Sequence, residues 1–363
     1  FKNFEGESFG PISLGRALEV SCDTVFYGLS DNEWKRDGGI NPKKTPKDYF
    51  YKAAHQFGLG KETGIDLPNE VTGRVPDRKW KADYWKANKA VWCKTGKKGG
   101  TYVQQIAYEN CLEGNRMREG DSINYSIGQG DTLVTPIQEA AIYSAVSNGG
   151  TLYAPTIGKA LVSPDGKTVR EIKPKKNGKL PVDQATLRGI NDAFAGVVTR
   201  GTAAWKFGGW PQDKIPLHAK TGTAEVYGKQ TTSWLATYSK DYTIIMTISQ
   251  AGTGSGASGE AVRKIYNALY GVSADGAIDK KKALLATPQK SLPKIESDGS
   301  IDSPEVSKDP VKDLKANDAL RDGTTDPGQD LPAGTTPSPT AANRDTRRRS
   351  ARRGKPRGKQ VLT

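Results

Sequence analysis

Three short stretches of the chain carry residues that could form a catalytic or binding site. The first is Lys-Thr-Gly-Thr-Ala at 220–224, where one lysine precedes small residues that suit a strand. Two apolar, β-branched-rich runs follow, at 233–238 and 242–249, so we expect an antiparallel sheet with 220–224 at its edge. An edge strand can pair with an extended peptide while the Lys220 ammonium binds a carboxylate or moves a proton.

The second stretch is Ser21-Cys22-Asp23, where a helical pattern over 13–28 is interrupted. It places a hydroxyl and a carboxylate on one loop, two residues apart. Ser and Asp are also favoured at helix N-termini, and from this segment alone a helix cap is the preferred interpretation. The apolar stripe expected on this helix consists of Leu14, Leu18, Phe26 and Leu29.

The third stretch is a glycine-punctuated turn, Ile-Gly-Gln-Gly-Asp at 127–131, followed by Val-Thr-Pro at 134–136. Thr135 is a favoured helix cap and Pro136 suits the first helical position, so we predict a helix that ends at the Asn-Gly-Gly of 148–150. Two glycines around a polar residue could cradle a phosphate. No Gly-Lys-Ser/Thr follows, which argues against a nucleotide site.

The letters Lys-Thr-Gly recur at 94–96, inside a polar, Lys-rich insertion from 77 to 120. Its tryptophans are Trp80, Trp85 and Trp92. Because Cys93 precedes this copy and Lys-Lys-Gly-Gly follows it, we expect a solvated loop and no reactive site. Interleaved Trp and Lys could stack on nucleic-acid bases, but anchoring of an insertion against its own domain is the preferred interpretation.

Apolar periodicity predicts the elements around these stretches. Three further helices are expected, at 46–58, 181–198 and 260–270. A hairpin is expected from 153 to 172 with its turn at 164–166, and a Gly- and Ser-rich link at 251–259. The inward face of the last helix is expected to consist of Ala261, Ile265, Ala268 and Leu269. Together these elements predict an α+β fold, an antiparallel sheet flanked by helices.

The positive charge of the chain is concentrated near its end. Between Arg344 and Lys359 nine Lys or Arg residues stand against one Asp, so 9 − 1 = 8 of the net +14 lies there. From 287 onward Pro, Ser, Asp, Thr and Gly dominate, so we predict a globular region at 1–286 and a disordered tail at 287–363. The Arg-rich end could bind nucleic acid, but no base-reading element accompanies it, and an anionic lipid or another anionic polymer suits it better.

Three cysteines are too few for a disulfide scaffold. Cys93 and Cys111 could pair in an oxidising compartment; the alternative is that these two and Cys22 are buried or partly buried thiols. His55 and His218 lie far apart without metal-ligand spacing, so we expect neither a metal nor an organic cofactor. We interpret His218 as a strand-entry residue, with contact to the site as the alternative.

In their order along the chain, these motifs resemble those of the penicillin-binding transpeptidases, and more closely the class B, elongation-type penicillin-binding protein 2 group. Ser21-Cys22-Asp23 takes the place of the family's S-x-N motif, the turn at 127–131 that of its Gly-Gln-Gly turn, and 220–222 that of its K-T-G strand. The match runs from about Phe1 to Gly271. It implies the penicillin-binding/serine β-lactamase-like fold, with an all-helical subdomain beside the sheet.

Two departures from the family pattern stand out. Asp23 replaces the usual Asn, and its carboxylate could hydrogen-bond a lysine ammonium directly. The family's acylating Ser lies in an S-x-x-K motif, but here the only S-x-x-K is Ser291-Leu-Pro-Lys294, in the tail, with a Pro that forbids the required helix. The chain also lacks an initiating Met, a targeting segment and an apolar run of membrane-spanning length, so we interpret it as a fragment whose N-terminal part, with the nucleophile, is missing.

The resemblance implies a D,D-transpeptidase that acts on D-Ala-D-Ala stem peptides of peptidoglycan and is acylated by β-lactams. Ser21 would relay a proton to the leaving nitrogen, and Lys220 would supply positive potential. Thr221 and Thr223 would hold the terminal carboxylate, with the Thr223 N–H as an oxyanion donor, and a Cβ on Gly222 would obstruct the substrate. A membrane glycosyltransferase partner and the extracytoplasmic face of a bacterial membrane are implied as well. The alternatives are a non-catalytic wall-peptide-binding relative and a D,D-carboxypeptidase or β-lactamase-like hydrolase.

Overall fold

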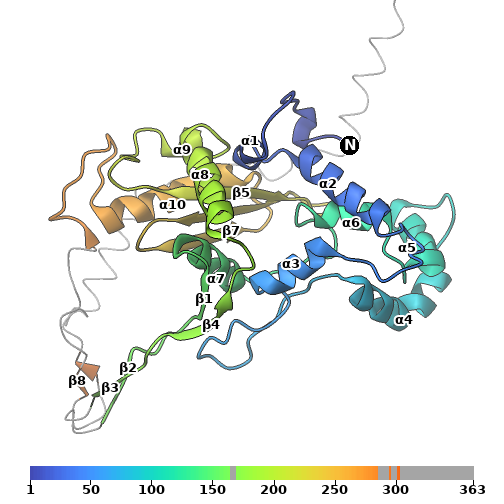
Figure 1. Cartoon of the computed structure of the whole chain (residues 1–363), viewed down its shortest axis with the longest axis horizontal. Helices are drawn as coiled ribbons and strands as arrows, with labels where there is room; N and C mark the ends of the chain where they lie inside the picture. Colours follow the sequence, from blue (N-terminus) through green and yellow to red (C-terminus); the bar gives the residue numbers. More distant parts are fainter. Residues whose placement is uncertain (164–168, 285–293, 296–300, 303–363) are drawn as a thin grey trace, which may run out of the picture. The chain divides into compact units, whose positions relative to one another are not determined.

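The computed structural model describes residues 1–163, 169–284, 294–295 and 301–302 (Figure 1). The chain divides into two units, Phe1–Ser291 and Leu292–Thr363. In the second unit the described residues form one short antiparallel pair, β8 (Lys294–Ile295) with β9 (Ile301–Asp302). The hairpin turn expected at 164–166 and the remainder of the expected disordered tail, including its Arg-rich end, lie outside the described residues.

The first unit alternates helices with short antiparallel strands. Its helices are η1 (Phe4–Gly6), α1 (Leu14–Glu19), α2 (Asp23–Arg36), α3 (Tyr49–Phe57), α4 (Arg78–Thr95), α5 (Tyr102–Glu113), α6 (Glu119–Tyr125), α7 (Pro136–Ser147), α8 (Gln184–Thr199), α9 (Ala204–Phe207) and α10 (Gly254–Tyr270). Its strands are β1 (Thr151–Ala154), β2 (Ala160–Val162), β3 (Val169–Glu171), β4 (Lys175–Lys179), β5 (His218–Ala224), β6 (Thr232–Tyr238) and β7 (Thr243–Ile248). No helix among the described residues is both long and apolar enough to cross a membrane.

The central sheet has the order β5-β6-β7 and is antiparallel throughout, as predicted (Figure 1). β5 is an edge strand, with Lys220 opposite Ala236 of β6. Consecutive residues of β6 point to opposite faces of the sheet. Thr237 accepts a hydrogen bond from Tyr266 of α10, whereas Tyr238 belongs to the core cluster that contains Val146 of α7. Helices α10 and α7 therefore cover opposite faces of the sheet.

Several predicted helix ends have the expected capping chemistry. Thr135 caps α7 and forms a reciprocal capping box with Gln138, and Asp183 caps α8 by accepting the Thr186 N–H. Gly58 ends α3 in the left-handed conformation that favours glycine. These short-range signals were sufficient because each cap involves residues only three or four positions apart.

The start of the last helix was predicted wrongly, and its inward face was predicted only in part. α10 begins at Gly254, inside the expected Gly- and Ser-rich link. A Cβ at Gly254 would come within 2.6 Å of the Gly222 carbonyl oxygen, so the glycine allows the start of α10 to pack closely against β5. Among the apolar residues of α10, Val262 and Tyr266 are buried and the expected Leu269 packs against the same core, whereas the expected Ile265 is 39% exposed. The buried Tyr266 hydroxyl is satisfied by Thr237, a partner that periodicity cannot reveal.

Two other expectations on helices and strands were only partly right. The interrupted helix at the start is α1 followed by α2, but Leu14 and Leu29 are 56% and 46% exposed rather than part of the apolar stripe. The expected hairpin is shorter, with β2 paired to β3, while β1 pairs instead with β4. β4 was missed because its sequence, Lys-Lys-Asn-Gly-Lys, is fully exposed and carries no apolar alternation.

The insertion forms two packed helices, so the prediction of a loop at 94–96 is wrong, although Lys94 and Thr95 are exposed to solvent as expected. Lys94 and Thr95 end α4, which begins at the cap Asp77. α4 and α5 are joined by a disulfide between Cys93 and Cys111, which answers the open question of cysteine pairing. Cys22 is a free, buried thiol.

The partly buried Glu139 on α7 generates a testable prediction for stability. Burial raises the pKa of its carboxyl to about 7. A carboxyl whose pKa is raised by folding favours the folded state most below its unfolded pKa, and that contribution is lost as the pH rises through about 7. Glu139→Gln should therefore stabilise the protein by about 1–3 kcal/mol near pH ~8 and by much less near pH ~4.5.

Urea unfolding of both proteins at the two pH values checks this prediction. Glu62→Gln, at an exposed position, is the matched control and should leave the midpoint unchanged at both. An equal shift of the Glu139→Gln midpoint at the two pH values would show that ionisation of Glu139 is not involved.

Candidate active site

The structure brings two of the three predicted stretches into direct contact. Lys220 Nζ donates a hydrogen bond to Ser21 Oγ at 2.8 Å, across 199 residues of sequence, and another to the Thr221 carbonyl at 2.7 Å. Lys220 lies on the edge strand β5, and Ser21 lies in the turn between α1 and α2. A hydroxyl and an amine in this geometry can exchange a proton with each other or with a bound substrate.

Ser21 is held in an unusual backbone conformation. Its φ is +55°, in the left-handed region that non-glycine residues seldom adopt. The turn is enforced by the Cys22 N–H, which donates to the Ala17 carbonyl at 2.8 Å, and by burial of the Cys22 side chain. Strained residues of this kind cluster at functional sites, because the surrounding fold must over-determine their position.

Burial shifts the Lys220 amine toward neutrality. Desolvation lowers the pKa of Lys220 to about 8, and the charge of Asp23 partly opposes that shift. An amine with a pKa near 8 changes its protonation state close to neutral pH. Lys220 is therefore suited to giving and taking a proton, which an ordinary exposed lysine is not.

Asp23 affects Lys220 through its charge and not through a hydrogen bond. Within the described part of the chain, Lys220 makes no hydrogen bond or ion pair to Asp23, so the direct contact considered from the sequence is not formed. The ammonium is engaged by Ser21, and the carboxylate accepts a hydrogen bond from the Phe4 backbone. Burial raises the pKa of Asp23, while the Phe4 hydrogen bond and the Lys220 charge act in the opposite direction.

The hydroxyls of Thr221 and Thr223 lie on the face of β5 opposite Lys220, because side chains alternate along a strand. Thr221 Oγ1 lies 2.6 Å from Thr202 Oγ1, and Thr223 Oγ1 accepts the Gly254 N–H at 3.1 Å. Both hydroxyls thus have protein partners. A Cβ on Gly222 would lie 3.2 Å from Trp234 Cβ, so packing against β6 already favours glycine there.

A buried carboxylate that the sequence did not reveal anchors the Ser21 turn. Glu19 is 4% exposed, and it accepts hydrogen bonds from Arg16 Nη1 at 2.8 Å and from Arg200. Although burial alone raises the pKa of Glu19, the two guanidiniums outweigh it and hold this pKa below its usual value. The Glu19 carbonyl accepts the Thr202 N–H at 3.2 Å, so Thr202 contacts both α1, which precedes the Ser21 turn, and Thr221 of β5.

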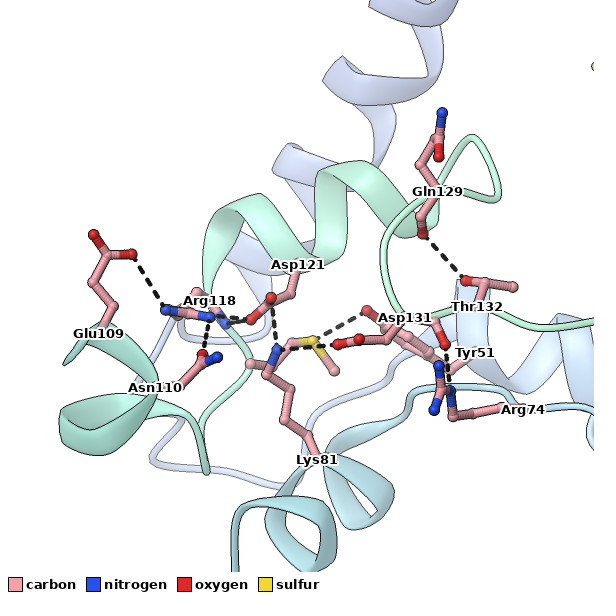
Figure 2. Close-up of polar contacts among 11 residues, drawn as sticks. Tyr51, Arg74, Lys81, Glu109, Asn110, Arg118, Asp121, Gln129, Asp131 and Thr132 are labelled. Carbon is pink, nitrogen blue, oxygen red and sulfur yellow. Dashed lines mark hydrogen bonds and ion pairs between the residues drawn. The ribbon is translucent and has the colours of Figure 1, made fainter. Parts of the chain in front are cut away.

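Lys81, which belongs to the insertion, fixes the glycine-punctuated turn through ion pairs (Figure 2). Lys81 is 6% exposed and forms ion pairs with Asp121 Oδ1 at 2.6 Å and Asp131 Oδ2 at 3.9 Å. Arg74 Nε donates to the Asp131 carbonyl, and Thr132 donates to the Gln129 carbonyl at 3.3 Å. A buried lysine is not visible in a Lys-rich sequence, which is why Lys81 was missed.

The Gly-Gln-Gly turn and His218 stand apart from the Lys220–Ser21 contact. Among the described residues, no hydrogen bond or ion pair joins the turn at 128–130 to Ser21 or Lys220. The turn connects to α2 through α6, where Ser122 and Ser30 share a hydrogen bond of 2.9 Å. The His218 ring stacks on Tyr238 at 4.6 Å, in keeping with a strand-entry residue.

Comparison with known proteins gives a consistent match. Residues 1–269 match the family model described as the penicillin binding protein transpeptidase domain. The peptidoglycan D,D-transpeptidase MrdA of Acinetobacter baumannii is 27% identical over 226 residues, which cover 62% of this chain and 27% of that protein. MrdA of Escherichia coli strain K12 is 28% identical, with 63% and 29% covered. The chain thus spans less than a third of the length of these relatives.

Solved structures give the same answer for the fold. Pseudomonas aeruginosa PBP2, solved in complex with WCK 5153, has a TM-score of 0.55 and 21% identity, with 78% of this chain and 55% of that one covered. Helicobacter pylori PBP2, solved in complex with MreC, has a TM-score of 0.50 and 24% identity, with 73% and 41% covered. The predicted α+β fold, with a sheet flanked by helices and a helical part formed by α2–α6, is confirmed.

The electrostatic role of Asp23 can be tested on Lys220. Since the Asp23 charge raises the pKa of Lys220, Asp23→Asn should lower that pKa further, by a few tenths of a unit to about one unit. Reductive ¹³C-methylation of lysines followed by NMR titration reports the pKa of Lys220, with the resonance assigned by Lys220→Arg. Glu260→Gln, at an exposed position on α10, is the control. An unchanged or raised pKa in Asp23→Asn would rule out the assigned coupling.

The close packing of α1 on α8 can be tested with two glycines. A Cβ at Gly201 would overlap the backbone carbonyl of Glu19, so Gly201→Ala should destabilise the protein by about 1–3 kcal/mol. Gly189 lies on α8 with open space around its position, and Gly189→Ala should stabilise by about 0.5–1 kcal/mol. The free energy of unfolding in urea measures both changes. Equal effects of the two variants would contradict the packing described here.

Proposed function

The chain belongs to the penicillin-binding protein transpeptidase domain family, and on that basis we propose that it forms most of the transpeptidase domain of a class B, PBP2-like enzyme that cross-links peptidoglycan. The contact of Lys220 with Ser21 is the observation that carries the proposal, because it joins two family motifs through groups that can move a proton. The substrate class is a stem peptide that ends in D-Ala-D-Ala, and β-lactams are its covalent mimics.

The reaction is acyl transfer in two steps. A serine attacks the carbonyl carbon of the penultimate D-Ala, the C–N bond breaks, and the terminal D-Ala leaves with a proton. The amine of a second stem peptide then attacks the acyl-enzyme, releases the serine and forms the cross-link. No S-x-x-K lies in the globular part of the chain, so the acylating serine comes from sequence outside these 363 residues.

Ser21 and Lys220 move the protons in this scheme. Ser21 Oγ passes a proton to the leaving nitrogen, and Lys220, whose pKa lies near 8, replaces it. The fixed turn of Ser21 removes the entropy of searching for this geometry. Asp23 keeps Lys220 from losing its proton too easily, since its negative charge raises the pKa of the amine.

The free edge of β5 supports the substrate. An extended peptide pairs with the edge strand, and the Thr223 N–H donates to the oxyanion of the tetrahedral intermediate. Thr221 and Thr223 hold the terminal carboxylate once their hydroxyls exchange Thr202 and the Gly254 N–H for the substrate. No metal or organic cofactor takes part in this scheme.

The surroundings of the complete protein form the last part of the proposal. Helicobacter pylori PBP2 was solved in complex with MreC, which supports the proposal that the present protein also acts as part of a protein complex. We place this domain on the extracytoplasmic face of a bacterial membrane, with a membrane glycosyltransferase as partner. The Arg-rich end at 344–359 carries eight net positive charges, nine basic residues against one acidic, and contacts an anionic lipid or wall polymer.

Covalent labelling with a fluorescent penicillin tests the proposed function. The complete protein should label, and Ser21→Ala or Lys220→Ala should slow labelling by about 100-fold or more, because proton transfer contributes on this scale. Lys240→Ala, at an exposed position after β6, is the control and should label at the wild-type rate.

Two results would count against the proposal. Failure of the complete protein to label would overturn the transpeptidase assignment and favour a non-catalytic peptide-binding role. Covalent labelling of the isolated 363-residue chain would show that the nucleophile lies within it.

A further inference from the structure

Two exposed tyrosines meet beside the end of the site strand. The ring of Tyr102, the first residue of α5, stacks on the ring of Tyr227 in the β5–β6 loop, with centroids 4.5 Å apart and planes inclined by 20°. Tyr102 is 57% exposed and Tyr227 is 70% exposed, so solvent covers most of both side chains. The stack therefore connects the insertion to the loop that follows Lys220–Ala224.

The Tyr102 side of this stack is rigidly held. The capping box of Thr101 and Gln104 fixes the start of α5, and the Cys93–Cys111 disulfide ties α5 to α4. The other end of α5 is anchored as well, since Arg118 Nη2 donates to Asn110 Oδ1 at 2.9 Å (Figure 2). Lys81 then joins α4 to α6. Tyr102 therefore lies on a helix whose position is fixed at both ends.

The Tyr227 side is weakly held and adjoins the site. Residues 225–230 of the loop are all exposed, and the loop contains a turn closed by the Lys229 N–H and the Val226 carbonyl at 3.1 Å. The loop begins one residue after β5, and the charge of Glu225 acts on Asp23 and Tyr27 of α2. The end of β5 is therefore bordered by α2, by the loop and, through the stack, by α5.

We propose that Tyr102 and Tyr227 form an aromatic closure that determines which acyl donors reach Lys220. The inference rests on the proposed function, in which the donor lies along the free edge of β5. A donor with a slender acyl side chain fits beneath the closed pair, whereas a bulky one must separate the rings. Only one exposed aromatic contact is lost on opening, so the closed state is favoured by about two- to ten-fold, and the closure selects by size without blocking the site.

The experiment compares acylation of the complete protein by two β-lactams, one with a small and one with a bulky aromatic acyl side chain. In Tyr102→Ala and in Tyr227→Ala, the ratio of the bulky to the small acylation rate should rise by about two- to ten-fold. The double variant should show no further rise, because either single change already removes the stack. Tyr102→Phe and Tyr227→Phe keep the ring and should retain the wild-type ratio.

Tyr49→Ala is the matched control, since Tyr49 is also the first residue of a helix, α3, and is 54% exposed. A second readout needs no activity: amide hydrogen exchange at 225–231 in the 363-residue chain should quicken in Tyr102→Ala and not in Tyr49→Ala. Unchanged exchange in Tyr102→Ala would show that the stack does not hold the loop, and would overturn the closure.

The kinetic outcomes separate the closure from the proposed function. If the wild-type protein reacts with neither β-lactam, the transpeptidase assignment fails. If the wild type reacts but the bulky-to-small ratio is unchanged in the alanine variants, the closure is overturned. An equal fall of both rates would also overturn it, because that result belongs to a residue that positions β5 and not to one that selects by size.

Discussion

The ion pairs of the buried Glu19 are the interaction on which the candidate site depends most. A buried carboxylate is costly unless it is paired, and here Arg16 and Arg200 satisfy it from two different elements. The pairing fixes α1 against the end of α8, where glycines at 196 and 201 allow the close approach. Since Ser21 follows Glu19 by two residues, the position of its hydroxyl opposite Lys220 follows from this packing.

The parts of the fold that the sequence predicted are those decided by neighbouring residues. The caps at Thr135 and Asp183, the strands β5, β6 and β7, and the interrupted helix around Ser21 all depend on interactions within a few residues or on simple periodicity. The K-T-G and S-x-N-like motifs could likewise be placed in order along the chain, and the order was enough to indicate the family.

The features that the sequence did not predict depend on partners distant in the chain. Glu19 and Arg200 are 181 residues apart in the sequence. Lys81 can be buried because it forms ion pairs with Asp121 of α6 and with Asp131. The Gly- and Ser-rich composition of 251–259 predicted a link, whereas α10 begins there and Gly254 packs closely against β5. A closely packed glycine, a buried lysine and a buried glutamate at a helix end have no local signature, because each derives its role from what packs against it.

Thr202 has one further consequence for how the two sides of the site respond to each other. Its N–H binds the carbonyl of Glu19, its hydroxyl binds Thr221, and its carbonyl accepts the Ser255 hydroxyl at 2.8 Å. A ligand that takes the Thr221 hydroxyl for itself must release Thr202, which also holds the helix that leads to Ser21. By thermodynamic reciprocity, any change that stabilises Ser21 in its turn alters the affinity of β5 for that ligand by the same factor. Binding of the substrate to β5 and the position of the Ser21 hydroxyl are therefore thermodynamically coupled.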